Sequence, residues 1–392
     1  MKTKKLYDLD AYETSFEATV LSCEVLEKKD ENDNHIYAVV LDQTLFFPEE
    51  GGQTPDKGEL ENTEVLDVQI KGDVITHYLA KELEVGKKVR GQIEWQHRFF
   101  NMQQHSAEHI FSGLADKKYG YKNVGFHLSN QIVTMDFDGT FTEAQLEEME
   151  WEVNEAIAKN VLVKTGYPSK EELENLPYRS KIEIDADIRI VEVEGYDICA
   201  CCAPHVHRTG EIGSFKIQSA QNYKGGTRIS FLCGFRALEE YRRKAKIITE
   251  LSGILTTNQD NLPEHVSKLK AQIQTLKAEL SNAKKEVMDY KIADIAKDEE
   301  NVILFERDLD NVVMRSVVNK LVESHEGICA VFVGSDKNGY IFILGSKNID
   351  CRETIKVLKE NFDARGGGSA QMVQGSLTAT QENIIQKMLS VS

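Results

Sequence analysis

The sequence predicts an α+β protein with four parts: an N-terminal β-barrel, a metal-binding α/β core, a coiled-coil helix and a C-terminal α/β domain. Three observations predict it. Short β-rich runs fill the first 95 residues, two pairs of metal-ligating residues follow, and a heptad pattern precedes a second region of alternating strands and helices. The boundaries expected from these patterns are 1–95, 96–240, 241–297 and 298–392.

Length and composition bound the class of protein. The chain has 392 residues, of which 41% are hydrophobic and 28% charged, as in soluble proteins of two or three domains. No apolar run is long enough to span a membrane, and no apolar segment follows the basic start, so neither a membrane protein nor a secreted one is expected. Seven cysteines, three of them at 199, 201 and 202, favour a metal site in the reducing cytoplasm over a disulfide framework.

The net charge of the chain bears on whether its partner is a nucleic acid. The formal value of −17 argues against nucleic acid as a partner. Basic residues nevertheless cluster between positions 236 and 246. An RNA partner would therefore have to be held by local basic patches.

The first 95 residues read as a small barrel. Runs of β-forming residues alternate with Gly, Asp and Asn turns, and they predict strands at 18–26, 35–41, 64–70, 74–79 and 88–93. A Gly-rich loop interrupts this pattern. It follows Thr44 and reads Pro48-Glu-Glu-Gly-Gly-Gln53.

Two motifs carry the metal chemistry. His105 and His109 are four residues apart in a predicted helix, 98–117, so that both imidazoles lie on one face. Cys201 and His205 have the same spacing, which a tight turn can also bring together. The four offer three nitrogens and a thiolate, a set suited to one tetrahedral Zn²⁺ per chain. The alternative is that the two pairs are unrelated.

Further elements of the core follow the same reasoning. Strands are predicted within 126–137, near 182–193, at 213–217 and at 227–232. Thr142 is a helix cap before a helix that runs to about residue 159, and another helix begins at Gly234.

A coiled-coil seam is the clearest periodic signal. Apolar residues recur in steps of four and three over four heptads, at Leu262, Val266, Leu269, Ile273, Leu276, Leu280, Ala283, Val287 and Tyr290. The partner of this helix is either the preceding helix, 236–255, or another subunit.

The C-terminal region reads as a separate α/β domain. Strands are predicted at 302–305, 328–333 and 340–344, and helices at 308–324, 352–361 and from Thr380. Three glycines, Gly366 to Gly368, mark a connection that is either a structural turn or a phosphate-binding loop.

Taken together, these motifs resemble the freestanding alanyl-tRNA editing proteins, the AlaX group, in its long form. The resemblance rests on Thr44 with its Gly-Gly-Gln loop, the HxxxH and CxxxH pairs, the sequence Cys233-Gly-Phe-Arg-Ala237, and a C-terminal part similar to the DHH-associated domain of alanyl-tRNA synthetases. The chain departs from the family pattern at Glu50, where a glycine or serine is commoner. Cys202, beside the matched Cys201, is a less suitable ligand, as are Cys199 and His207.

The resemblance implies a trans-editing hydrolase that deacylates mischarged tRNA(Ala), carrying serine or glycine, without an aminoacylation domain. It implies a zinc centre of His105, His109, Cys201 and His205 in the editing core, with zinc either activating water or shaping the pocket. Thr44 and Gln53 would discriminate the substrate. The expected tRNA contacts are Arg98, Arg228, Arg242, Arg365, Gly366, Gly367 and Gly368.

The sequence is also compatible with an alternative function and with a homodimer. The alternative function is a non-catalytic, zinc-stabilised tRNA-binding adaptor whose coiled coil carries the activity. A homodimer formed through the coiled coil or the C-terminal domain is also compatible with the sequence.

Overall fold

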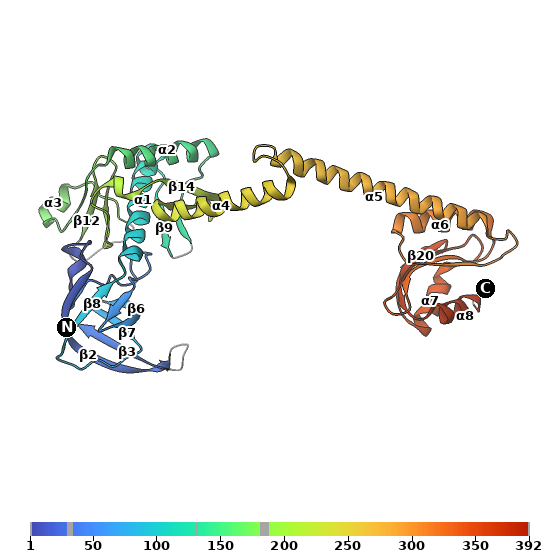
Figure 1. Cartoon of the computed structure of the whole chain (residues 1–392), viewed down its shortest axis with the longest axis horizontal. Helices are drawn as coiled ribbons and strands as arrows, with labels where there is room; N and C mark the ends of the chain where they lie inside the picture. The colour runs from blue at the N-terminus through green and yellow to red at the C-terminus, as the bar shows by residue number, and fades with distance from the viewer. Residues whose placement is uncertain (1, 30–33, 130–131, 181–187, 391–392) are drawn as a thin grey trace. The chain divides into compact units, whose positions relative to one another are not determined.

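The computed structural model describes residues 2–29, 34–129, 132–180 and 188–390. Contacts divide the chain into two compact units, Met1–Ile248 and Thr249–Ser392. Each unit combines helices with sheets (Figure 1), which confirms the predicted α+β class. Among the described residues, no helix is long and apolar enough to cross a membrane.

The first unit begins with six strands whose pairing closes on itself. The order is β2-β3-β7-β6-β5-β8, and β8 pairs back onto β2. Side chains along β7 and β8 alternate between the core and the outside, which is why the sequence predicted these strands. The elements are β1 (Lys4–Lys5), η1 (Leu6–Asp8), β2 (Ser15–Lys29), β3 (His35–Leu41), β4 (Gln43–Thr44), β5 (Gly58–Leu60), β6 (Thr63–Lys71), β7 (Val74–Leu79) and β8 (Lys88–Ile93).

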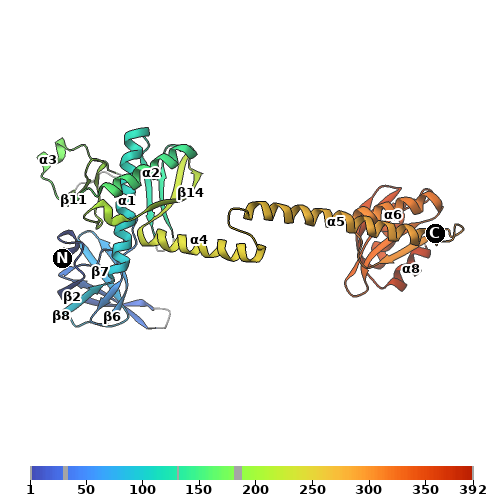
Figure 2. The same ribbon diagram turned by 45° about the horizontal axis from the view of Figure 1, so that its top comes forward.

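One long helix connects this sheet to the second layer of the unit. The helix, α1 (Trp95–Tyr119), runs from the six strands toward α2 in both views (Figures 1 and 2). It ends at Gly120, whose φ of 70° is the left-handed conformation of a helix cap. Almost every side chain between 101 and 115 is buried, including polar ones. Buried polar side chains need partners, and the backbone of Cys233 supplies both hydrogen bonds of Gln104.

The second layer packs α1 and α2 (Glu143–Lys159) on a four-stranded sheet of order β14-β15-β10-β9. The predicted cap at Thr142 is confirmed, because it makes a capping box with Gln145. The strands of this sheet are β9 (Asn123–Leu128), β10 (Val133–Phe137), β14 (Phe215–Tyr223) and β15 (Gly226–Cys233).

A small three-stranded sheet carries the cysteine segment. Its order is β11-β12-β13. Its elements, with the short helices beside it, are β11 (Val163–Gly166), α3 (Lys170–Asn175), β12 (Ile190–Val193), β13 (Asp197–Ala200) and η2 (Thr209–Ile212). Of the strand predicted near 182–193, residues 182–187 lie outside the described residues.

The second unit is a five-stranded sheet with helices packed on it. Its order is β16-β17-β18-β20-β19, with β16 and β17 parallel and the other pairs antiparallel. Helix α4 (Gly234–Leu255) crosses the boundary between the units. The other elements are α5 (Leu262–Ala293), β16 (Val302–Glu306), α6 (Asn311–Ser324), β17 (Cys329–Ser335), β18 (Gly339–Gly345), α7 (Cys351–Asn361), β19 (Asp363–Gly368), β20 (Met372–Thr378) and α8 (Gln381–Leu389).

The triple glycine lies in a strand, so the predicted turn or loop at 364–369 is wrong. Gly366 to Gly368 form the end of β19 at the edge of the sheet. A Cβ at Gly366 or Gly368 would come within 2.4 Å of a carbonyl oxygen of β20. These glycines therefore serve close approach of two backbones, which a low β-propensity concealed from sequence reasoning.

The predicted heptad helix forms as the single helix α5. Its apolar seam stays largely exposed, from 43% at Leu269 to 77% at Tyr290. Near its end, Met288 is buried against α6. No described helix covers the seam, so the coiled coil itself remains a prediction.

Candidate metal centre

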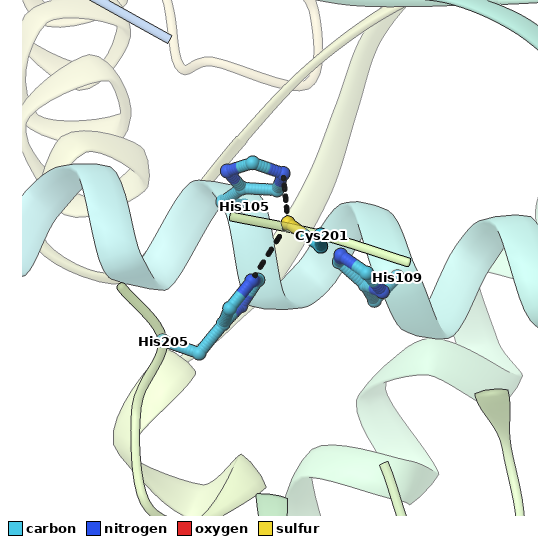
Figure 3. Close-up of side chains that lie close together, drawn as sticks. All are labelled: His105, His109, Cys201 and His205. Carbon is cyan, nitrogen blue, oxygen red and sulfur yellow. Dashed lines mark hydrogen bonds between the residues drawn. The ribbon is translucent and has the colours of Figure 1, made fainter. Parts of the chain in front are cut away.

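Two segments far apart in the sequence bring four ligand-bearing side chains together. His105 and His109 come from the middle of α1, while Cys201 and His205 come from the segment after β13 (Figure 3). One nitrogen or sulfur atom from each lies within 4.8 Å of the others. Cys201 Sγ is 3.6 Å from Nε2 of His105 and 3.4 Å from Nε2 of His205.

Each histidine is oriented by a second hydrogen bond from its other ring nitrogen. Nδ1 of His105 is 3.0 Å from Gln53 Oε1, and Nδ1 of His205 is 3.0 Å from Ser106 Oγ. Nδ1 of His109 is 2.8 Å from Asp197 Oδ2. Amide and carboxylate oxygens accept hydrogen bonds, so Nδ1 carries the proton in His105 and His109. Their Nε2 lone pairs are then available to a metal.

A further pair holds the carboxylate that orients His109. The guanidinium of Arg179 donates two hydrogen bonds to Asp197, of 2.7 and 2.8 Å. This bidentate geometry fixes the carboxylate plane. Asp197 is 5% exposed, so a change of its position would have to move its buried neighbours too.

The electrostatic environment selects Cys201 as the thiolate. Burial alone would raise its pKa, but the interactions of the thiol with the imidazoles of His105 and His205 hold the pKa of Cys201 well below its ordinary value. Burial raises the pKa of Cys199 to about 11 instead, which keeps that thiol neutral.

The pKa values of His205 and His109 are shifted in opposite directions. Burial lowers the pKa of His205 to about 3, which favours the neutral ring that metals bind. Burial also opposes the charge on His109, yet its hydrogen bonds to Asp197 and Cys201 hold its pKa well above the ordinary value.

This donor set fits zinc. Three imidazoles and one thiolate are ligands of borderline softness, and four of them complete a tetrahedral shell. The orienting bonds from Gln53, Ser106 and Asp197 are the supports that metal-binding histidines usually have. The arrangement can hold one metal ion, and the residues for it are already in place.

Comparisons with known proteins find similarity along most of the chain. Residues 188–230, which include Cys201 and His205, match the family described as the threonyl and alanyl tRNA synthetase second additional domain. Residues 2–97 match tRNA synthetases class II (A). The alanyl-tRNA editing protein Aarsd1 of Danio rerio is 29% identical over 380 residues, 93% of this chain and 92% of that protein. The chain is therefore similar to alanyl-tRNA editing proteins over nearly its whole length.

Other relatives extend the comparison. The editing protein Aarsd1-A of Xenopus laevis is 27% identical over 399 residues, which are 97% of both chains. The alanine–tRNA ligase of Ignicoccus hospitalis is 28% identical over 99% of this chain, which spans 42% of that ligase. Among solved structures, the C-Ala domain of Aquifex aeolicus alanyl-tRNA synthetase matches 23% of this chain and 88% of that domain, at 19% identity and a TM-score of 0.21.

Gln53 lies beside the metal ligands, whereas the described hydrogen bonds of the Thr44 hydroxyl go to His77 and Phe46. Thr44 is fully buried, and its Oγ1 is 2.9 Å from His77 Nε2. His77 Nδ1 lies 3.3 Å from the Val39 carbonyl, so Nδ1 is the donor and Nε2 accepts from the Thr44 hydroxyl. The Thr44 oxygen also accepts from the backbone N–H of Phe46, at 3.0 Å. One lone pair of Thr44 remains.

Of the predicted tRNA contacts, the one at Arg98 is wrong. Its side chain is fully buried and forms an ion pair with Asp56. It also donates to the carbonyl oxygens of Ala11 at 2.9 Å and Leu45 at 2.6 Å. Arg98 therefore ties α1 to the N-terminal strands, and no phosphate can reach it.

The other predicted tRNA contacts lie at the surface of the protein. Arg228 pairs with Asp136 through two bonds of 2.7 Å, and its guanidinium stacks 3.7 Å above the Tyr223 ring. Arg242 is exposed on α4, and Arg365 is exposed on β19 beside the glycines.

Sequence reasoning missed the residues that support the ligands: Ser106, Arg179 and Asp197. Ser106 lies within the HxxxH motif and follows His105 directly, so its position was visible, although its partner His205 is 99 residues away. Asp197 lies 88 residues from His109. The one available signal was an acidic residue four positions before Cys201, at the start of a short strand.

Proposed function

We propose that this chain is a trans-editing hydrolase that removes a wrongly attached amino acid from tRNA(Ala). The observation that carries the proposal is the convergence of His105, His109, Cys201 and His205 in a chain related to editing proteins over nearly its whole length. The reaction is hydrolysis of the ester between the amino acid and the terminal ribose of the tRNA.

The expected substrates are seryl and glycyl esters. An alanine-activating pocket excludes poorly a smaller amino acid or one that adds a single hydroxyl, so a second sieve is required. That sieve must accept serine and reject alanine. A polar group left unpaired by alanine provides such a difference.

The four ligands would hold one Zn²⁺. When bound, zinc supplies Lewis acidity that favours attack on an ester carbonyl. Gln53, Ser106 and Asp197 orient the three imidazoles, so that no energy is spent on arranging ligands during the reaction.

Thr44 is our candidate for the residue that recognises the serine hydroxyl. Its own proton is committed to His77, and its remaining lone pair can only accept. A serine side chain has the hydroxyl donor that this lone pair requires, and an alanine side chain does not.

Recognition of the tRNA is assigned to exposed groups. Arg228, Arg242 and Arg365 are the candidates for phosphate contacts, with the exposed glycine edge of β19 beside Arg365.

The proposed domain division is a Gly-Gly-Gln domain (1–95), a zinc-binding core (96–240), a helical segment (241–297) and a C-terminal domain (298–392). A cytoplasmic location and a homodimer belong to the same proposal.

One observation favours the second candidate function. Four protein ligands complete a tetrahedral shell, as in zinc sites that only stabilise a fold. An adaptor that binds tRNA without hydrolysing it would have the same centre.

Deacylation of Ser-tRNA(Ala) separates the two candidates. Ala-tRNA(Ala) and Ser-tRNA(Ser) serve as substrate controls, and zinc content is measured for every protein. We expect rapid loss of serine from tRNA(Ala) alone, abolished by Cys201→Ala and retained by Cys23→Ala, which changes a half-buried cysteine in β2. A zinc-loaded wild-type protein that binds tRNA but leaves the ester intact would support the adaptor and overturn the hydrolase.

A further inference from the structure

Buried polar atoms without partners gather beside the metal centre. Tyr7 Oη, Glu50 Oε2 and Gln53 Nε2 have no hydrogen-bond partner within the described part of the chain. Tyr7 and Gln53 are at most 1% exposed, while Glu50 is half-buried. Leaving such groups unpaired in a folded protein is costly, so their presence indicates a ligand that pairs with them.

The Gly-Gly-Gln loop places these atoms next to the ligands. Gln53 holds His105 through its carbonyl oxygen and leaves its amide nitrogen free. A Cβ built on Gly51 would lie 3.6 Å from Cys202 Sγ, so the loop packs directly on the residue after the ligand Cys201. Backbone bonds of 3.1 and 3.3 Å between Glu50 and Gln53 close the turn.

Glu50 acts electrostatically on both neighbours. Cys202 lies close enough to Glu50 for the charge of that carboxylate to act on its thiol. Burial raises the pKa of Tyr7, with Asp8 and Glu50 adding to the effect. The Tyr7 phenol therefore stays protonated beside the Glu50 carboxylate.

The missing partner of this carboxylate is a cation. Within the described residues, Glu50 forms no ion pair with a basic side chain; Lys5 is near enough to act on Cys202 but does not bond to Glu50. A buried carboxylate oxygen gains most from a charged donor. The free amide nitrogen of Gln53 suits an oxygen of the same ligand.

We propose that Glu50 and Tyr7 form a subsite for the α-ammonium group of the aminoacyl ester. This inference rests on the proposed function and adds the feature of the substrate that is recognised. An aminoacyl ester carries an ammonium group one carbon from its ester carbonyl, so an acceptor at Glu50 and a donor at Gln53 match the two ends of one small ligand. The subsite selects esters with a free amino group.

The test compares two esters that differ at this group. Nitrous acid converts seryl-tRNA(Ala) to glyceryl-tRNA(Ala), which replaces the ammonium by a hydroxyl. We measure kcat/KM for both esters with wild type, Glu50→Gln and the matched control Glu49→Gln, an exposed neighbour bonded to Gln69. Glu50→Gln is expected to lose roughly 10- to 100-fold on the seryl ester, the range of a charge-assisted hydrogen bond, and less than threefold on the glyceryl ester.

The outcomes distinguish failure of the subsite from failure of the proposed hydrolase function. Equal losses on both esters, or no loss on either, would overturn the subsite while leaving the hydrolase intact. Tyr7→Phe, which removes only the phenolic oxygen, gives an independent reading if Glu50→Gln fails to retain zinc. If wild type hydrolyses neither ester, the proposed function fails, and binding of 3′-serylamino-3′-deoxyadenosine against its deaminated analogue still tests the subsite: equal affinities for the two would overturn it.

Discussion

Asp197 accepts a hydrogen bond of 2.8 Å from Nδ1 of His109. The opposite ring nitrogen of His109 is thereby directed to the group of four ligands. Arg179 holds the same carboxylate from its other side. A ligand on α1 is thus fixed by the start of β13, the strand that leads into the segment bearing the other two ligands.

Loss of the Asp197 charge should weaken metal binding. Asp197→Asn keeps the size of the side chain but no longer supplies two equivalent carboxylate oxygens to His109 and Arg179. We expect zinc affinity to fall roughly 10- to 100-fold, as for other residues that orient metal-binding histidines. Competition with a chromophoric chelator measures it.

A matched control exists in the same unit. Asp136 makes a similar bidentate pair with Arg228 but orients no ligand. Asp136→Asn should leave zinc affinity unchanged. An equal loss in both variants would show that the effect is general destabilisation and not orientation of His109.

Two substitutions at Gln53 test whether its side-chain oxygen orients His105. Gln53→Glu keeps an oxygen that accepts from His105, whereas Gln53→Leu removes it. We expect Gln53→Leu to lower zinc affinity roughly 10-fold or more, and Gln53→Glu to stay near wild type. The same chelator titration reports both. Indistinguishable affinities of the two variants would contradict a ligand-orienting role for Gln53.

His77 should make stability depend on pH below neutrality. Burial lowers its pKa from 6.5 to about 4, so the unfolded chain takes up a proton in this interval that the folded chain refuses. The contribution of the neutral ring is complete above pH 6.5 and is lost as the pH falls toward 4. At about 1.4 kcal/mol per pH unit, this interval is worth roughly 3 kcal/mol.

Urea unfolding between pH 4 and 7.5 tests this prediction. His77→Gln retains a donor and an acceptor for Val39 and Thr44 but does not titrate. The free energy of unfolding of the variant should fall less than that of wild type over this range. Parallel curves for the two proteins would show that His77 does not carry the dependence.

Arg98 should matter for stability and not for tRNA. Arg98→Leu leaves Asp56 buried without its cation, although the backbone N–H of Phe47 still donates to it at 2.7 Å. We expect the free energy of unfolding to drop by roughly 3–5 kcal/mol. Arg242→Ala, at an exposed site on α4, is the comparison: it should weaken tRNA binding in filter assays and leave stability unchanged. Weaker tRNA binding by a folded Arg98→Leu protein would argue against this division.

Local patterns in the sequence predicted most of the elements. The alternation in β7 and β8 and the i, i+4 spacing of His105 and His109 are properties of single segments, which is why they could be read directly. The cap at Thr142 was visible for the same reason. Strand β19 was missed because three successive glycines have a low β-propensity. This segment forms a strand only because it pairs with a neighbouring strand.

Contacts between distant segments limited the rest. Arg98 looks like a surface cation until Asp56, 42 residues earlier, is placed against it. Gln53 was expected to touch substrate, and its bond to His105 spans 52 residues. Such pairings follow from how the sheets and α1 are stacked, and spacing along the chain does not encode them.

The most direct test of a catalytic metal centre is a zinc titration of the metal-free protein, with the initial rate of Ser-tRNA(Ala) deacylation as the readout. We expect no activity without zinc, a linear rise in rate as zinc is added, and a plateau at one zinc per chain. Full activity of the metal-free protein, or a zinc-loaded protein with no activity, would contradict this expectation.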